Sequence, residues 1–254
     1  MATNTPRTVE AVQKTCRIIN ELQRRGETGI TELSEDVEYS KSTIHGHLAT
    51  LVDEGLVIKN NQKYRLSLRF LDIAESVKNR VTDYEIVHDQ VRELAEETGE
   101  VVHFGAEENG RVVYIAKWQG AQAVQTKSRI GKQMPMHSTS LGKAILAEYG
   151  RDRVDEIVEQ HGLEARTQNT LTRPSALHDN LQEITQRGYS VDDEENILGI
   201  RCIGIPVSIS EAGVIGALSI SGPSQRMTDD RIKNDLREKI AQAANVIEVN
   251  SRYS

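Results

Sequence analysis

The sequence predicts an α+β protein with a small helical domain at its start, a connecting helix, and a larger domain built on an antiparallel sheet. Three observations support this prediction. Residues 1–67 hold three amphipathic segments and then two short apolar ones, residues 68–82 continue one apolar stripe, and residues 83–254 mix strand-like with helix-like segments. A chain of 254 residues is long enough to give each domain its own core.

Charge and composition exclude several classes of protein. The chain carries 31 Lys and Arg against 38 Asp and Glu, a net charge of −7, so any contact with nucleic acid must be local. No apolar run approaches the roughly 20 residues of a membrane-spanning helix, and the first ten residues lack the apolar centre of a signal peptide. Two cysteines cannot form a disulfide framework or a Cys-rich zinc site. We therefore expect a cytoplasmic protein that contacts no membrane.

Apolar spacing and capping residues predict the first domain. The expected elements are, in order, helices over residues 9–25, 31–37 and 41–54 and strands over residues 57–59 and 63–66. Gly26 and Gly55 end the first and third helices, and the hydroxyl of Ser40 can cap the free amides that start the third. Three helices followed by a hairpin are the pattern of a winged helix-turn-helix domain.

The third helix has an outward face suited to DNA. With Ile44 taken as the buried direction, about 100° per residue places Ser42, Gly46 and Ala49 on the opposite side, with His45 on its flank. Small residues there let the helix enter a major groove, where its polar side chains reach base edges or phosphates. We expect the following residues to contact DNA, the last two through the wing: Ser40, Lys41, Ser42, Thr43, His45, Gly46, Ala49, Lys63 and Arg65. The alternative is that Gly46 and Ala49 pack against another helix of the same protein.

The rest of the chain predicts a connecting helix and a sheet. The stripe that starts at Leu68 fits a helix that joins the two halves, and from its residues alone this helix could pack on its own domain. After a helix that ends at Gly99, the turn Asn109–Gly110 gives a strong hairpin signal. Further strands fit residues 123–126, 190–192, 202–208 and 214–221, and further helices fit residues 139–149, 154–161, 175–187 and 231–249.

Several segments in series resemble one family. These are ITELSEDVEYSKSTIHGHLATLVDEGLV (30–57), KYRLSLRFLDIA (63–74), MPMHSTSLGKAILA (134–147), RGYSVDDEENILGIRCIGIPV (187–207) and IGALSISGP (215–223). Together they resemble the IclR family of transcriptional regulators across essentially the whole chain. The resemblance implies a DNA-binding domain over 1–67, a linker helix over 68–82 that helps to pair subunits, and a GAF-like effector-binding domain over 83–254. Gly46 departs from the family, which often has a large basic residue there.

The resemblance also implies a pocket for a small effector, such as an organic acid or a sugar-derived metabolite. Its residues would be Ser140, Leu141, Asp192, Cys202, Ser219 and Ser221. A few polar groups in an apolar cavity are typical of small-molecule sites. Each has a structural alternative: the two later serines can bond backbone, Cys202 can be a core residue, and Asp192 can lie in a solvated acidic loop. His137 is either a pocket donor or a structural histidine, and Lys143 can be a solvated helix residue.

The sequence therefore predicts a homodimer or dimer of dimers that binds a palindromic operator and a small-molecule effector. We expect no cofactor, no metal and no catalytic residue. Two alternatives stay open. One is a metal-responsive regulator that uses His103, His137, His161 or His178, although none has the spacing of a strong metal motif. The other is a hydrolase built on Cys202, His137 and Asp192, although no nucleophile elbow and no Gly-rich phosphate loop occur.

Overall fold

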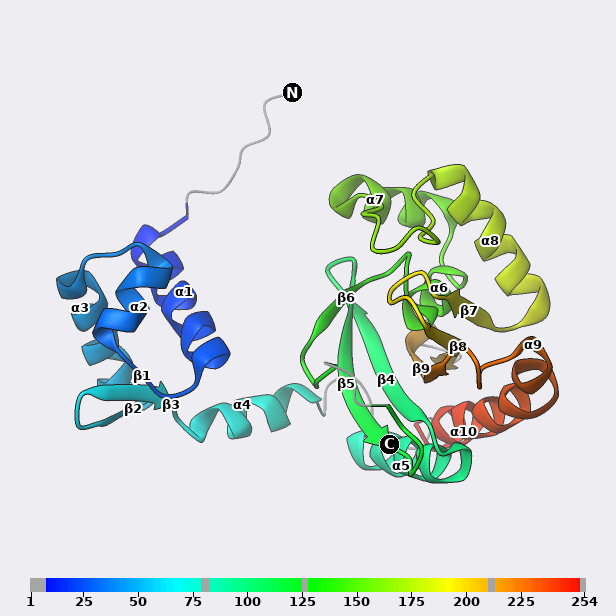
Figure 1. The fold of residues 1–254 in the computed structure, drawn as a ribbon, viewed down its shortest axis with the longest axis horizontal. Helices are drawn as coiled ribbons and strands as arrows, with labels where there is room; N and C mark the ends of the chain where they lie inside the picture. Colours follow the sequence, from blue (N-terminus) through cyan, green and yellow to red (C-terminus); the bar gives the residue numbers. More distant parts are fainter. Residues whose placement is uncertain (1–7, 79–82, 125–127, 210–212, 252–254) are drawn as a thin grey trace. The chain divides into compact units, whose positions relative to one another are not determined.

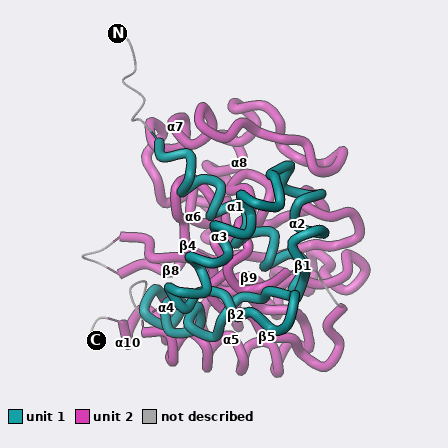
Figure 2. Tube along the Cα trace, turned by 90° about the vertical axis from the view of Figure 1, so that its left-hand side faces the viewer, with its two compact units in different colours: residues 1–77 teal, residues 78–254 magenta. Residues whose placement is uncertain are grey.

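The chain forms two compact units that divide between residues 77 and 78 (Figure 2). The computed structural model describes residues 8–78, 83–124, 128–209 and 213–251. Within these ranges, every helix is too short or too polar to span a lipid bilayer. The connecting helix predicted over 68–82 corresponds to a helix of ten residues that closes the first unit, and residues 79–82 lie outside the described ranges.

The first unit is a helical bundle with a small antiparallel sheet. Its elements are α1 (Glu10–Arg25), β1 (Thr28–Gly29), α2 (Ile30–Val37), α3 (Lys41–Asp53), β2 (Val57–Asn60), β3 (Lys63–Leu66) and α4 (Arg69–Lys78), with strand order β1-β3-β2 (Figure 1). The core gathers one apolar face from each of the first three helices and the inward residues of the hairpin: Ile18, Leu22, Leu33, Ile44, Leu48, Leu51, Val57 and Tyr64. The three helices and the hairpin therefore fold as the sequence predicts, while β1 is too short to leave a sequence signal.

The second unit is built on a six-stranded antiparallel sheet. Its elements are α5 (Tyr84–Thr98), β4 (Val101–Glu108), β5 (Arg111–Gln119), β6 (Gln133–Pro135), α6 (Ser140–Leu146), α7 (Arg151–His161), α8 (Pro174–Arg187), β7 (Ser190–Asp193), β8 (Ile200–Ile209), β9 (Gly213–Pro223), α9 (Asp229–Arg231), a π-helical turn (Ile232–Leu236) and α10 (Arg237–Asn250). The strand order is β6-β5-β4-β9-β8-β7. The predicted α+β class with an antiparallel sheet is confirmed.

The two faces of this sheet carry different partners (Figure 1). Alternate residues of the strands point to opposite faces. On one face, Val102, Phe104, Ile203, Leu218 and Ile220 pack with α5 and α10 into the largest core cluster. The other face is covered by α6, behind which α7 and α8 complete a second cluster. The candidate ligand pocket described below lies on this second face.

Three predicted elements of the second unit differ from the structure. Of the strand predicted over 123–126, Ala123 and Val124 lie in a loop and residues 125 and 126 lie outside the described residues. The short strand β6 had no sequence signal. Thr139 does not begin a long helix but caps α6, which ends at Leu146. The last predicted helix, over 231–249, contains a π-helical turn (Ile232–Leu236) between α9 and α10.

Candidate functional site

The outward face of α3 is open. Ser42, His45, Gly46 and Ala49 are exposed, while Ile44 on the opposite side is fully buried. A β-carbon placed on Gly46 would meet no atom within 4 Å. The described part of the first unit therefore contains no helix that packs against this face, and the alternative that Gly46 and Ala49 are packing residues finds no support within it.

The start of α3 is held in place by its own side chains. The Oγ atom of Ser40 accepts a hydrogen bond from the backbone N–H of Thr43 at 3.2 Å, which caps the helix. The ammonium of Lys41 donates to Oγ1 of Thr31 on α2 at 3.1 Å. The first contact fixes where α3 begins, and the second joins its start to α2. Lys41 and Ser42 remain exposed, so both can still reach a phosphate.

A groove runs beside α3, between the start of α2 and the hairpin. It holds about 900 Å³, open solvent included, and its lining is polar and partly cationic: Gly29, Ile30, Thr31, Glu32, His45, Lys59, Gln62, Lys63 and Tyr64. Lys63 and Arg65 are exposed on β3, on either side of the buried Tyr64. The structure thus places His45 and Lys63 in one groove. Lys59 joins them although the sequence did not single it out, because it lies opposite Tyr64 in the hairpin register.

In the second unit, one cavity collects all six residues of the predicted pocket. It holds about 460 Å³, open solvent included, and is lined by His103, Tyr114, Ser128, Thr139, Ser140, Leu141, Asp192, Asn196, Ile197, Ile200, Cys202, Ser219 and Ser221. The six predicted residues come from α6, β7, β8 and β9. Residues as far apart in the sequence as Ser140 and Ser221 therefore line one cavity.

The strand register explains how these residues meet. His103, Ser219 and Gly204 are direct partners across β4, β9 and β8, and the next row joins Ser221, Cys202 and Asp192 across β9, β8 and β7. Direct partners share one face of a sheet. Two adjacent rows of polar and small side chains thus form the floor of the pocket. That register cannot be read from the spacing of the segments alone.

Helix α6 lies directly on this floor. The hydroxyl of Ser190 donates to the carbonyl oxygen of Ser140 at 2.6 Å. A β-carbon on Gly204 would come within 2.7 Å of that same oxygen, so only glycine lets α6 approach the sheet so closely. Ser140 and Leu141 consequently line the same cavity as Ser219 and Ser221.

Asp192 is buried rather than part of a solvated loop. Its side chain is 2% exposed, and its Oδ1 atom accepts the backbone N–H groups of Glu195 at 2.8 Å and Asn196 at 3.3 Å. The thiol of Cys202 donates towards Oδ2 at 3.7 Å. Burial raises the pKa of Asp192 to about 7, although the nearby ammonium of Lys143 lowers it. The carboxyl group therefore changes charge near neutral pH.

Lys143 is not a solvated helix residue. Every residue of α6 is buried, and the Lys143 side chain is 1% exposed. Its ammonium forms a short ion pair with Oε1 of Glu195, which lies in the loop that follows Asp192. The positive charge of Lys143 and the negative charge of Glu195 cancel, and the pair links α6 to the loop that borders the pocket.

The other end of the pocket is formed by residues that the sequence did not indicate as ligand contacts. The His103 ring stacks on Tyr114 with centroids 4.6 Å apart, and its Nε2 atom lies 2.9 Å from Oγ of Ser128. Burial lowers the pKa of His103 to about 3, with Lys117 and Lys132 contributing, so the ring is neutral at physiological pH. His103 can therefore donate or accept a single hydrogen bond but brings no charge to a ligand.

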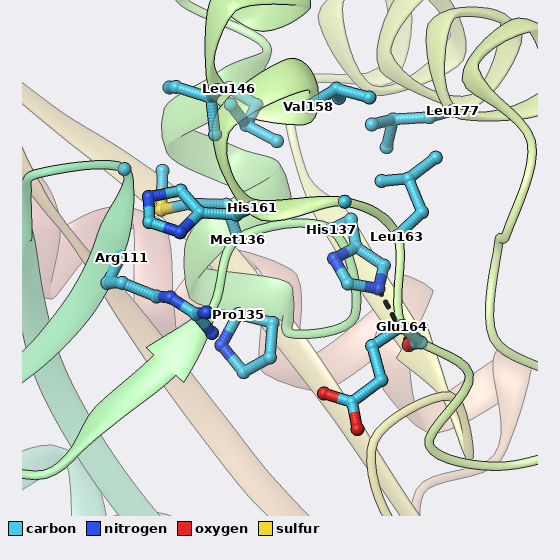
Figure 3. A pocket seen from close by; sticks show the side chains of 13 residues that line it. Arg111, Pro135, Met136, His137, Leu146, Val158, His161, Leu163, Glu164 and Leu177 are labelled. Carbon is cyan, nitrogen blue, oxygen red and sulfur yellow. Dashed lines mark hydrogen bonds between the residues drawn. The ribbon is translucent and has the colours of Figure 1, made fainter.

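A second cavity, shown in Figure 3, lies on the same side of the sheet. It holds about 380 Å³, open solvent included. Figure 3 shows Arg111 and His161 on one side of it, His137 beside Leu163 and Glu164 on the other, and Leu146, Val158 and Leu177 along a third edge. Nε2 of His137 lies 3.1 Å from the carbonyl oxygen of Glu164, and burial lowers the pKa of this histidine. His137 therefore holds the loop after α7 in place, and it does not line the cavity of Asp192 and Cys202.

This placement argues against both alternatives from the sequence. The hydrolase set is divided, because His137 borders a different cavity from Cys202, and burial raises the pKa of the Cys202 thiol. Among the residues that the structure describes, no three His, Cys, Asp or Glu side chains are grouped closely enough to hold a metal ion. Neither alternative is supported.

Comparisons with known proteins agree with this reading. Residues 79–249 match the family model for the bacterial transcriptional regulator IclR C-terminal domain, and residues 13–59 match that for bacterial regulatory proteins of the arsR family. The HTH-type transcriptional regulator KdgR of Escherichia coli (strain K12) is 36% identical over 230 residues, 90% of this chain and 88% of that protein.

Solved structures show the same fold. The crystal structure of Thermotoga maritima IclR has a TM-score of 0.80 and 28% identity, and covers 94% of this chain and 97% of that one. An IclR homolog from Microbacterium hydrocarbonoxydans, complexed with 4-hydroxybenzoate, has a TM-score of 0.83 over 96% of this chain and 100% of that one, at 21% identity. The matching relatives are transcriptional regulators and not enzymes. The chain belongs to the IclR family of bacterial transcriptional regulators, in which a helix-turn-helix part binds DNA and the C-terminal domain binds a small molecule.

Proposed function

We propose that this protein binds a palindromic operator through the outward face of α3. The observation that carries the proposal is the open face of Ser42, His45, Gly46 and Ala49, which lets the helix backbone approach the bases. The helix start, from Ser40 to Thr43, would contact phosphates. Lys63 and Arg65 of the hairpin would hold the backbone or the minor groove beside it.

A palindromic operator calls for two copies of the reading helix, and α4 offers a surface for pairing. No residue of α4 is buried, and its apolar side chains Leu71, Ile73 and Val77 are exposed by 66%, 43% and 52%. Ile73 and Val77 lie one turn apart on one face of the helix and Leu71 lies on the other, and exposed apolar side chains on both faces are a candidate contact surface for another subunit. We propose a homodimer, or a dimer of dimers, that works in the cytoplasm and presents two copies of α3 about one DNA turn apart.

The pocket on the sheet would bind the effector. The ligand is proposed to be a small organic acid or a sugar-derived metabolite, as the pocket's hydroxyls suggest and as the 4-hydroxybenzoate complex of the Microbacterium homolog illustrates. Ligand binding would favour one arrangement of the C-terminal domains and so change operator affinity, with a coupling free energy of typically about 1–3 kcal/mol.

Operator binding is tested by a mobility shift on the DNA upstream of the protein's own gene. Ser42→Ala and His45→Ala should each weaken specific binding by about 1–3 kcal/mol, because each removes a contact to a base or phosphate. Neither should lower the melting temperature, since both side chains are exposed. Gln23→Ala, at an exposed position of α1, is the control. Full affinity in both variants would show that α3 does not read the DNA.

The effector pocket is tested by removing one hydroxyl. Ser219 is buried and lines the cavity, so its hydroxyl is a candidate contact for the ligand. Ser219→Val should therefore abolish the change in DNA affinity caused by any metabolite that stabilises the wild type in a thermal-shift screen. Basal DNA binding should be unchanged. Ser175→Val, at the exposed start of α8, should keep the response. A normal response in the Ser219 variant would exclude this cavity as the effector site.

A further inference from the structure

The buried charges around the pocket do not balance when Asp192 is ionised. The groups that face Asp192 are Lys143 of α6, Glu195 of the following loop, Cys202 of β8 and Tyr114 of β5. Lys143 and Glu195 neutralise each other. Burial raises the pKa of both the Cys202 thiol and the Tyr114 hydroxyl, so these groups are neutral near pH 7. An ionised Asp192 is thus one uncompensated negative charge at 2% exposure.

The geometry leaves one oxygen of this carboxyl group for a ligand. Oδ1 already accepts two backbone N–H groups, whereas Oδ2 faces only the weak thiol donor of Cys202 at 3.7 Å among the described residues. Asp192 lines the cavity, so Oδ2 is the atom that an incoming polar group would meet. A protonated Oδ2 would be a hydrogen-bond donor, and an ionised one would be an acceptor.

The charge of the ligand then decides the charge of Asp192. A carboxylate placed against an ionised Asp192 would put two like charges together in a buried site, and two such carboxylates favour sharing one proton. The described residues that line the cavity include no Lys or Arg, and the His103 ring is neutral. Lys117 and Lys132 act electrostatically on His103, and Arg166 acts on Tyr114, but none of the three is among the main influences on the pKa of Asp192. An uncharged ligand with a hydroxyl or amide group meets no such conflict.

We propose that an acid ligand enters the pocket together with one proton from the solvent, which its carboxylate and the carboxylate of Asp192 then share. The proposal rests on the proposed function, because it concerns the same cavity. It makes the pocket select ligands by charge as well as by shape. Above neutral pH, an acid must bring a proton that an uncharged molecule of the same shape does not need.

The test uses three acids and their amides as probes, on the full-length protein: glycolate, lactate and 4-hydroxybenzoate, with glycolamide, lactamide and 4-hydroxybenzamide. Calorimetry in two buffers of different ionisation enthalpy measures the protons taken up. Above pH 7 we expect one proton per bound acid, an acid affinity that falls about tenfold per pH unit, and amide affinities that do not change. In Asp192→Asn the pH dependence should vanish, because the amide still accepts both N–H groups but cannot titrate. Asp193→Asn, on the same strand but facing away, should keep it.

Several results would overturn the proposal. These are an acid affinity that does not vary with pH, binding of amides but of none of the acids, and no binding of any probe. A carbon-13 NMR titration of the Asp192 carboxyl group in the wild type gives a check that needs no variant. The carboxyl group should titrate near pH 7 in the free protein, and at a higher pH when an acid is bound. Titration below pH 5 would contradict the proposal. The mobility shift on upstream DNA is measured separately, so failure here is distinguishable from failure of the regulator assignment.

Discussion

Replacing Gly46 by glutamate should abolish operator binding while making the first unit more stable. Gly46 lies inside α3, is exposed, and has no atom within 4 Å of its missing β-carbon. A side chain at such a position adds about 0.5–1 kcal/mol of stability, because glycine costs that much in a helix interior. The glutamate side chain would set a negative charge against the phosphates and base edges that α3 is proposed to approach. We expect affinity to fall more than about 100-fold, which is roughly 3 kcal/mol.

Gly46→Ala is the matched control for this result. It should gain a similar stability in thermal unfolding, and lose much less affinity, since a methyl group is small and uncharged. If the glutamate variant bound the operator as well as the wild type does, α3 could not be the helix that enters the groove. If both variants were less stable than the wild type, we would conclude that another part of the protein occupies the space beside Gly46.

Removing the ammonium of Lys143 should have the largest effect on the second unit. Lys143→Met leaves the Glu195 carboxylate buried without its partner, and breaking a buried pair in this way costs about 3–5 kcal/mol. Denaturation with urea, followed by the fluorescence of Trp118, should show the loss. Trp118 is the single tryptophan of the chain and lies on β5, so its signal reports the second unit alone.

The double variant Lys143→Met with Glu195→Met distinguishes the effect of the ion pair on stability from the effect of the surrounding packing. Replacing both charges by apolar groups removes the unpaired carboxylate, so most of the lost stability should return. Equal losses in the single and double variants would mean that the ion pair matters less than the packing of α6. DNA binding by the folded double variant should persist, because the change lies outside the first unit.

Local patterns made much of this molecule predictable. The helical period of α3 identifies its outward face, and the cap at Ser40 fixes where the helix starts. The family resemblance leads to six residues that the fold does bring into one cavity. In each case the relevant signal lies within a few consecutive residues, either as a period, a cap or a motif.

What could not be predicted depends on contacts between distant segments. His103 and Tyr114 join the pocket because of the register between β4, β5 and β9, which no single segment encodes. The burial of Lys143 follows from α6 being covered on all sides, whereas a lysine on a short helix is usually solvated. The three residues of β6 are too few to show an alternating pattern.

One face of the large sheet packs in the main hydrophobic core and the other carries the pocket, and this arrangement has a consequence for how such regulators diversify. Along β4, β8 and β9, neighbouring positions serve either the main hydrophobic core or the floor of the pocket, but not both. If the cavity binds the effector as proposed, a point substitution such as one at Ser219 or Cys202 would alter what it recognises, while the side chains on the opposite face of the strand would still pack in the main core. On this architecture a single substitution can change ligand preference, and no second, stabilising substitution is needed to keep the domain folded.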